Sequence, residues 1–292
     1  MMDDLAVLFD VFPYAIGAGL IMATVCSVLG VFVVLKRVVF IGIALTQSAA
    51  AGIALAFMLG APPMTGALLM TMLTVTLLAY PYESRRVPRD AVLGAIYVFA
   101  AAISILIVSK SGFGLTEVQA LLYGDLIVAS QRDFWHLLFL LGGVFICFLL
   151  FFRPILFSFL DRDQARAVGL KATIWELLFF LLLGLAASGA SQAGGSLLVF
   201  CYLTVPAMMG LLIANRLWAT MLISALTACL ATLVGLYASY KTDLPTNQTI
   251  IAILCGMLAA VAAYRIILPR IRRLRHRATG HTNQLNTNTP HD

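Results

Sequence analysis

The stretch DRDQARAVGLK, residues 161–171, is a short polar segment in a chain that is otherwise largely apolar. The run before it, residues 134–160, is almost continuously apolar, and the chain becomes apolar again just after it. Asp161 or Asp163 can accept a hydrogen bond from the first free N–H groups of a short helix, and Gly169 can take the left-handed conformation that ends it. So short a helix is marginal alone in water. We therefore expect a partner surface to hold it.

The composition predicts an all-α, polytopic membrane protein. Of the 292 residues, 62% are hydrophobic and 11% are charged, and the mean hydropathy is +0.99. A soluble domain carries about 25% charged residues. The five cysteines all lie inside apolar runs, which favours packing over disulfide or metal chemistry. The net charge of +6 does not indicate a nucleic-acid partner, because the basic residues cluster at the ends of apolar runs.

Apolar runs near the length of a membrane span predict about eight to nine transmembrane helices. The candidate spans are residues 11–35, 41–59, 65–80, 91–108, 134–152, 174–187, 196–214, 217–240 and 249–264. The small residues of 184–195 permit either close helix packing or a break in a helix. We divide the chain into an N-terminal extracytoplasmic segment (1–10), a transmembrane domain (11–266) and a cytoplasmic tail (267–292) that is first basic and then disordered.

The basic residues predict the orientation. If Lys36 and Arg37 face the cytoplasm, all but three of the 19 basic residues do so too, and only Lys110, Arg132 and Lys241 lie outside. The N-terminus is then outside, and both the C-terminus and the 161–171 segment are cytoplasmic. The predicted spans hold almost no ionisable group, whereas gradient-driven carriers usually need one deep in the membrane. Energy is therefore expected to arrive through the cytoplasmic segment.

Several stretches together resemble the permease subunit of the zinc/manganese/iron ABC importer family (ABC-3 type), which is related to iron–siderophore permeases. The similarity extends from about residue 14 to 264, and no single stretch is specific. The stretches are GVFVVLKR (30–37) leading into FIGIALTQSA (40–49), RDAVLG (89–94), DQARAVG (163–169), GSLLVF (195–200) with LTVPA (203–207), and DLP (243–245).

The resemblance implies a permease of the type II ABC importer fold in a bacterial cytoplasmic membrane. It implies a second permease copy, two cytoplasmic ATP-binding subunits and an extracytoplasmic solute-binding protein. The 161–171 segment would be the coupling helix that docks on the ATP-binding subunit, with contacts from Asp161, Asp163, Gln164, Ala165, Arg166, Val168 and Gly169. The chain contains no G-x-x-x-x-G-K-[ST] motif, so ATP and Mg²⁺ are expected in the partner and no cofactor or catalytic residue in this chain.

The second predicted span departs from the family pattern. The family usually reads Gly-Asp-Ala-Leu-Ser-His-Ala there, with the Asp and His thought to line the metal path, and this chain has Ile43 and Gln47 at those positions. Isoleucine cannot bind a metal, and a neutral amide oxygen is a poor zinc ligand. Three interpretations stay open: a divalent metal passes over weak ligands, the cargo is a chelated metal or an organic solute, or the chain is a non-transporting or regulatory member. A gradient-driven carrier is a further alternative.

The remaining path residues each have a structural alternative. Thr46 and Gln47 are candidate ligands in the second span, and Asp243 resembles a family position at the outer mouth, where a solvated loop acid is equally expected. Cys201 and Met208 lie near one helix face around Pro206, and their sulfur atoms suit soft metals, although ordinary packing is the commoner use of both residue types.

Overall fold

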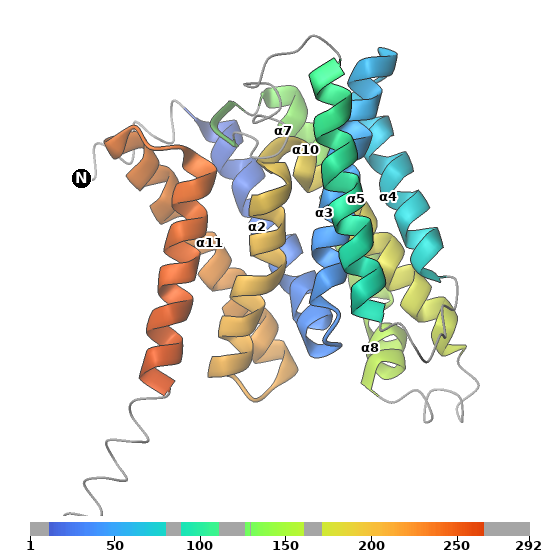
Figure 1. Cartoon of the computed structure of the whole chain (residues 1–292). Helices are drawn as coiled ribbons and strands as arrows, with labels where there is room; N and C mark the ends of the chain where they lie inside the picture. The colour runs from blue at the N-terminus through green and yellow to red at the C-terminus, as the bar shows by residue number, and fades with distance from the viewer. Residues whose placement is uncertain (1–11, 80–88, 111–125, 129, 161–170, 266–292) are drawn as a thin grey trace, which may run out of the picture.

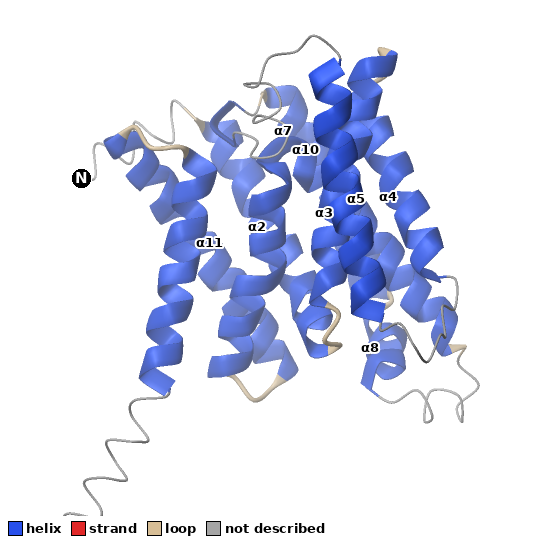
Figure 2. Cartoon of the chain, in the orientation of Figure 1, coloured by secondary structure: helices blue, strands red, loops and turns tan. Residues whose placement is uncertain are grey.

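The chain forms a bundle of long helices. A computed structural model describes residues 12–79, 89–110, 126–128, 130–160 and 171–265, and these ranges contain helices and connecting turns but no strand (Figures 1 and 2). The elements are α2 (Pro13–Leu35), α3 (Val39–Leu59), α4 (Pro63–Ala79), α5 (Arg89–Lys110), the 3₁₀ turn η1 (Leu126–Val128), α7 (Gln131–Leu150), α8 (Phe152–Leu160), α10 (Ala172–Ile213), α11 (Leu217–Thr242) and a final helix, Thr246–Arg265.

Hydrophobic length explains why these segments run as helices side by side. Six of the described helices are long and apolar enough to cross a membrane, and α4 and α5 carry shorter apolar stretches, Pro63–Leu77 and Ala91–Ile107. In hydrocarbon every backbone polar group needs an internal partner, which a helix provides. The ends are marked by local chemistry. Ser130 and Asp133 form a capping box at the start of α7, and Gly60 ends α3 in the left-handed conformation.

Helix α10 is interrupted at a single residue. Its 42 residues would extend about 63 Å if straight, roughly twice the apolar thickness of a bilayer. Gly195 has φ 71° and ψ 161°, a combination that is essentially restricted to glycine. The helix therefore divides at Gly195, and Figure 1 shows its two halves running in opposite directions through the bundle. Pro206 lies inside the second half, where the helix continues through it.

Contacts with α2 establish this reversal. Gly194 lies so close to Met22 that an added Cβ would collide with the methionine methyl group, and nine residues later Leu203 packs directly on Gly30. The second half of α10 therefore runs parallel to α2. The first half runs the other way, because Glu176 near its start lies beside the end of α2. Four buried phenylalanines, Phe32, Phe148, Phe152 and Phe179, together with the partly buried Phe159, fill the core near that end.

One buried amide holds the reversal. Asn247, in the first turn of the final helix, is 2% exposed. Its Nδ2 donates to the carbonyl of Gly194 at 2.9 Å, and its Oδ1 accepts from the backbone N–H of Leu126 in η1 at 3.4 Å. The break at Gly195 leaves nearby backbone groups without their helical partners, and such groups are paired when buried. Asn247 thus joins α10, η1 and the final helix at the end of the bundle opposite Glu176.

The prediction of an all-α polytopic membrane fold is confirmed. The small-residue stretch 184–195 was expected to give either close helix packing or a helix break, and the structure shows both. Gly184 packs closely on side chains of α4, and the helix breaks at Gly195. The predicted terminal segments, 1–10 and 267–292, lie outside the described residues, so the domain division stays a prediction.

Candidate functional site

The partly open face of α3 carries the two positions where the sequence departs from the family pattern. Phe40 is 54% exposed, and Ile43 and Gln47 are each partly exposed, while most of the other residues from Ile41 to Ala56 are buried. These three side chains recur at helical spacing and therefore share a face. Gln47 is the only amide on it. Its Oε1 atom is buried and accepts no hydrogen bond from the described residues. A buried acceptor without a partner is uncommon and favours an interaction with a ligand or water.

Thr46, the neighbouring candidate, lies differently. Its side chain is fully buried, and its hydroxyl group donates to the carbonyl of Ile43 within the same helix at 3.0 Å. Its proton is therefore already used, and only the oxygen lone pairs are left to accept. The structure does not place Thr46 on the open face with Gln47.

The sulfur candidates on α10 lie along one side of its second half, with different exposure. Cys201 is 5% exposed and Met208 is 36% exposed, while the adjacent Met209 is fully buried in the core. Within the described ranges, no three His, Cys, Asp or Glu side chains gather closely enough to hold a metal ion. Cys201 and Met208 thus lie about two turns apart on one helix, and no described acidic or histidine ligand joins them.

Asp243 ends α11. It is exposed and adopts the left-handed conformation (φ 51°, ψ 32°), which aspartate tolerates better than most residues. The turn that follows is held by the Ser239 hydroxyl group, which donates to the carbonyl of Leu244 at 2.6 Å. This geometry explains an aspartate at position 243 by backbone conformation. An exposed carboxylate there also remains free to attract cations.

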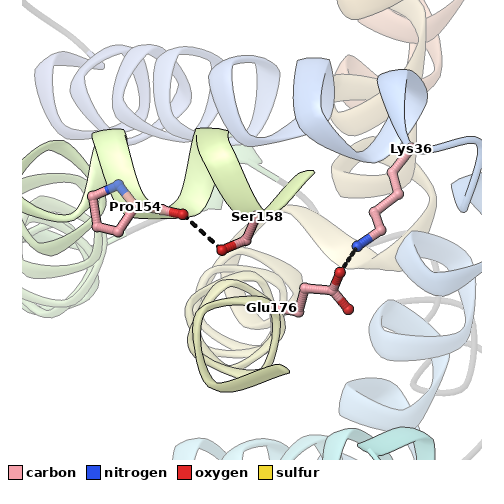
Figure 3. A network of polar contacts seen from close by, with 4 residues as sticks. All are labelled: Lys36, Pro154, Ser158 and Glu176. Carbon is pink, nitrogen blue, oxygen red and sulfur yellow. Dashed lines mark hydrogen bonds and ion pairs between the residues drawn. The ribbon is translucent and has the colours of Figure 1, made fainter. Parts of the chain in front are cut away.

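An ion pair joins α2 to α10 at the end of the bundle that is lowest in Figure 1. Lys36 Nζ lies 2.5 Å from Glu176 Oε1, and the two side chains are 20% and 7% exposed (Figure 3). The same ammonium group lies 4.1 Å from the ring centre of Phe159 in α8, which is a cation–π arrangement. Figure 3 also shows Ser158, whose hydroxyl group donates to the carbonyl of Pro154 within α8 at 2.8 Å.

Positions 161–170, which include all seven predicted coupling residues, lie outside the described part of the chain. The helices on either side are described, and α8 and the first turns of α10 both lie at the Lys36 end. The residues that sequence reasoning missed are Lys36 and Glu176 as a pair, and Asn247. Lys36 and Glu176 could each be noticed as a charged residue at the end of a predicted span, but nothing in the sequence indicates that residues so far apart form a pair. An amide just after the DLP stretch gave no comparable signal.

Comparisons with known proteins agree with this architecture. The model of the family described as "ABC 3 transport family" matches residues 9–265. The chain is 28% identical to the "Manganese transport system membrane protein MntC" of Halalkalibacterium halodurans. The alignment extends over 246 residues and covers 84% of each protein. It is 27% identical to the "Chelated iron transport system membrane protein YfeC" of Yersinia pestis, over 82% of this chain and 81% of that protein.

A solved structure supports the fold independently. The structure titled "PsaBC from Streptococcus pneumoniae in complex with Fab" superposes with a TM-score of 0.80 and 21% identity, covering 89% of this chain and 95% of the other. At that level of identity the likeness concerns the fold. The family match covers nearly the whole helical bundle, including α3, α10 and both helices that border the 161–171 segment. The chain belongs to the ABC 3 transport family of membrane permeases.

Proposed function

We propose that this chain is the transmembrane permease subunit of an ATP-driven importer for a divalent metal ion: zinc, manganese or iron. The observation that carries the proposal is the family match over residues 9–265, because it includes both the pore helices and the borders of the coupling segment. Relatives named for manganese and for chelated iron transport support the metal as cargo. The permease is not the enzyme of the complex, since ATP is hydrolysed in a partner subunit.

The energy enters through the 161–171 segment. In the proposed complex this segment is a coupling helix at the cytoplasmic end, seated on the ATP-binding subunit, while two copies of the permease form the pore and a solute-binding protein delivers cargo from outside. The bias of basic residues supports the direction of insertion, with the N-terminus outside and the C-terminus in the cytoplasm. Nucleotide-driven closure of the ATP-binding subunits then alternates access to the pore.

The cargo passes over weak oxygen ligands on α3. Gln47 supports this step because its buried Oε1 has an unused acceptor capacity among the described residues, and an amide oxygen binds hard divalent cations only weakly. A conduit needs weak sites, because the ion must leave again. The same acceptor would also receive a hydrogen bond from a chelated metal or an organic solute, which is the alternative cargo. Thr46, Cys201, Met208 and Asp243 remain candidate path residues.

The coupling assignment is tested by substituting Ala165 and Gly169 with tryptophan in the complex reconstituted with its ATP-binding subunits. We expect weaker binding of the ATP-binding subunit and loss of ATP-dependent Mn²⁺ uptake, because bulky residues would not fit a docking groove built for small ones. Gly142→Trp, on a glycine whose added Cβ meets nothing within 4 Å, is the control for bulk in a membrane helix. Unchanged binding and uptake in the double variant would refute the coupling role.

The cargo assignment is tested at Gln47. Gln47→His restores the imidazole that the family pattern carries, so Mn²⁺ and Zn²⁺ are expected to stay bound to the purified permease longer, and Zn²⁺ more so. Gln192→His, at an exposed amide in α10, is the control. If Gln47→His changes neither metal retention nor uptake, Gln47 does not line the path. If uptake of an organic solute is lost while metal binding is unchanged, the alternative cargo is favoured.

A further inference from the structure

We propose that the ion pair between Lys36 and Glu176 is the link that passes movement of the 161–171 segment to α3. This inference rests on the proposed function, because it takes 161–171 to be the part that the ATP-binding subunit displaces. Both residues are assigned positioning roles, and neither contacts the cargo.

Three elements meet at one ammonium group. Lys36 stands at the end of α2, Glu176 in the second turn of α10, and Phe159 is the last residue but one of α8. Phe159 and Glu176 lie on opposite sides of the 161–171 segment in the sequence, two residues before it and five residues after it. The two described borders of that segment therefore both contact the same side chain of α2, as Figure 3 shows for Glu176.

Burial makes this contact sensitive to displacement. Glu176 is 7% exposed at its side chain, and the Phe159 ring packs on Phe179 of α10 with ring centres 4.8 Å apart. Where water is scarce, an ion pair is strong only in good geometry, so displacing either helix weakens it. A well-packed apolar pair often stabilises a fold at least as well, so stability alone does not account for charges here. A charge pair does fix one relative position of α2 and α10.

The position of Lys36 is transmitted to α3 without a flexible linker. Only three residues separate α2 from α3, and they close tightly: the backbone N–H of Val38 donates to the carbonyl of Val33 and that of Arg37 to the carbonyl of Val34, with Arg37 in the left-handed conformation. This is a Schellman turn. Gln47 lies about 12 Å farther along α3, counting from its first residue at about 1.5 Å per residue. Movement at Lys36 therefore moves the helix that carries the proposed ligand.

The test uses the full-length permease in vesicles with its ATP-binding subunits and solute-binding protein, with Mn²⁺ as the probe. Two quantities are measured, the rate of ATP hydrolysis and the Mn²⁺ taken up per ATP hydrolysed. The variants are Lys36→Met, Glu176→Gln and the double exchange K36E/E176K. Arg216→Met, at an exposed basic residue at the same end of the bundle, is the matched control.

Each single variant is expected to lower Mn²⁺ uptake per ATP about tenfold, with ATP hydrolysis changed less than about twofold. The double exchange should recover uptake per ATP to within about threefold of the wild type, because it restores the attraction in reverse. A general structural defect would not be repaired by exchanging the charges. Arg216→Met is expected to behave as the wild type.

The inference is overturned if both single variants keep uptake per ATP within about twofold of the wild type, or if the double exchange is as impaired as the singles. If a charge variant does not assemble, Phe159→Leu decides, since it keeps both charges and removes only the ring. It should lower uptake per ATP about threefold, and an unchanged ratio overturns the inference. If the wild type itself takes up Mn²⁺ without hydrolysing ATP, the proposed function fails instead.

Discussion

Replacement of Asn247 by leucine tests how the reversal of α10 is held. Leucine has the same branched outline as asparagine, with bulkier methyl groups at its ends, but neither donates nor accepts a hydrogen bond. In the variant the carbonyl of Gly194 and the N–H of Leu126 lose their partner, and both residues are buried. Water cannot readily replace the amide there, because Asn247 is only 2% exposed.

The two hydrogen bonds contribute unequally. The bond to Gly194 is 2.9 Å long, near the optimum, whereas the bond from Leu126 is 3.4 Å, near the limit at which such bonds weaken. Leaving a buried backbone group unpaired costs about 1–3 kcal/mol, and measured values inside membrane proteins lie toward the lower figure. We therefore expect Asn247→Leu to lower the free energy of unfolding by about 2 kcal/mol in total. That corresponds to a decrease in Tm of roughly 5 °C.

The measurement is thermal unfolding of the purified chain in detergent, combined with hydrogen exchange of the η1 backbone. Gln248→Leu is the matched control, because it removes the neighbouring amide from an exposed position. The control should shift Tm by less than about 1 °C, as surface substitutions usually do. If Asn247→Leu has the same Tm as the control, and the η1 backbone exchanges hydrogen no faster than in the wild type, the reversal of α10 does not depend on this amide.

Substitutions at Gly30, Gly195 and Arg37 test the packing and backbone assignments by thermal unfolding, with Gly142→Ala and Arg37→Gly as references. Gly30→Ala should lower the free energy of unfolding by about 2 kcal/mol or more, because the added Cβ would collide with the carbonyl oxygen of Leu203. Gly142→Ala, with open space around it, should be neutral or stabilise by up to about 1 kcal/mol. Equal effects of the two substitutions would refute the close approach of α2 and α10. Gly195→Ala should cost about 1–3 kcal/mol through backbone strain alone, and a neutral result would place the break elsewhere. Arg37→Val should cost about 1–2 kcal/mol and Arg37→Gly nothing, since position 37 is left-handed; the opposite order would contradict the Schellman turn.

Helix positions were predictable from the sequence because apolar length alone nearly determines them. The predicted spans 217–240 and 249–264 correspond to Leu217–Thr242 and Thr246–Arg265, and 134–152 to Gln131–Leu150. The predicted span 174–187 is too short, because it ends within the small-residue stretch, whereas the helix continues to Gly194. Small residues lower the local mean hydropathy and so resemble the end of a span, but they pack well between neighbouring helices.

The candidate site was predictable only where helical spacing decides it. Ile43 and Gln47 share a face by spacing, and the structure leaves both partly exposed. Whether Thr46 is open to a ligand depends on which helices pack against α3, and the answer, fully buried, required tertiary structure. The same holds for Lys36 and Glu176, whose contact depends on the reversal of α10 at Gly195.

Uptake of Mn²⁺ into vesicles tests the central claim most directly. The purified permease is reconstituted either alone or with its ATP-binding subunits, in both cases with the solute-binding protein supplied outside the vesicles, and an ion gradient and ATP are supplied separately. We expect uptake only when the ATP-binding subunits and hydrolysable ATP are both present. Uptake by the permease alone, driven by a proton or sodium gradient, would contradict the account.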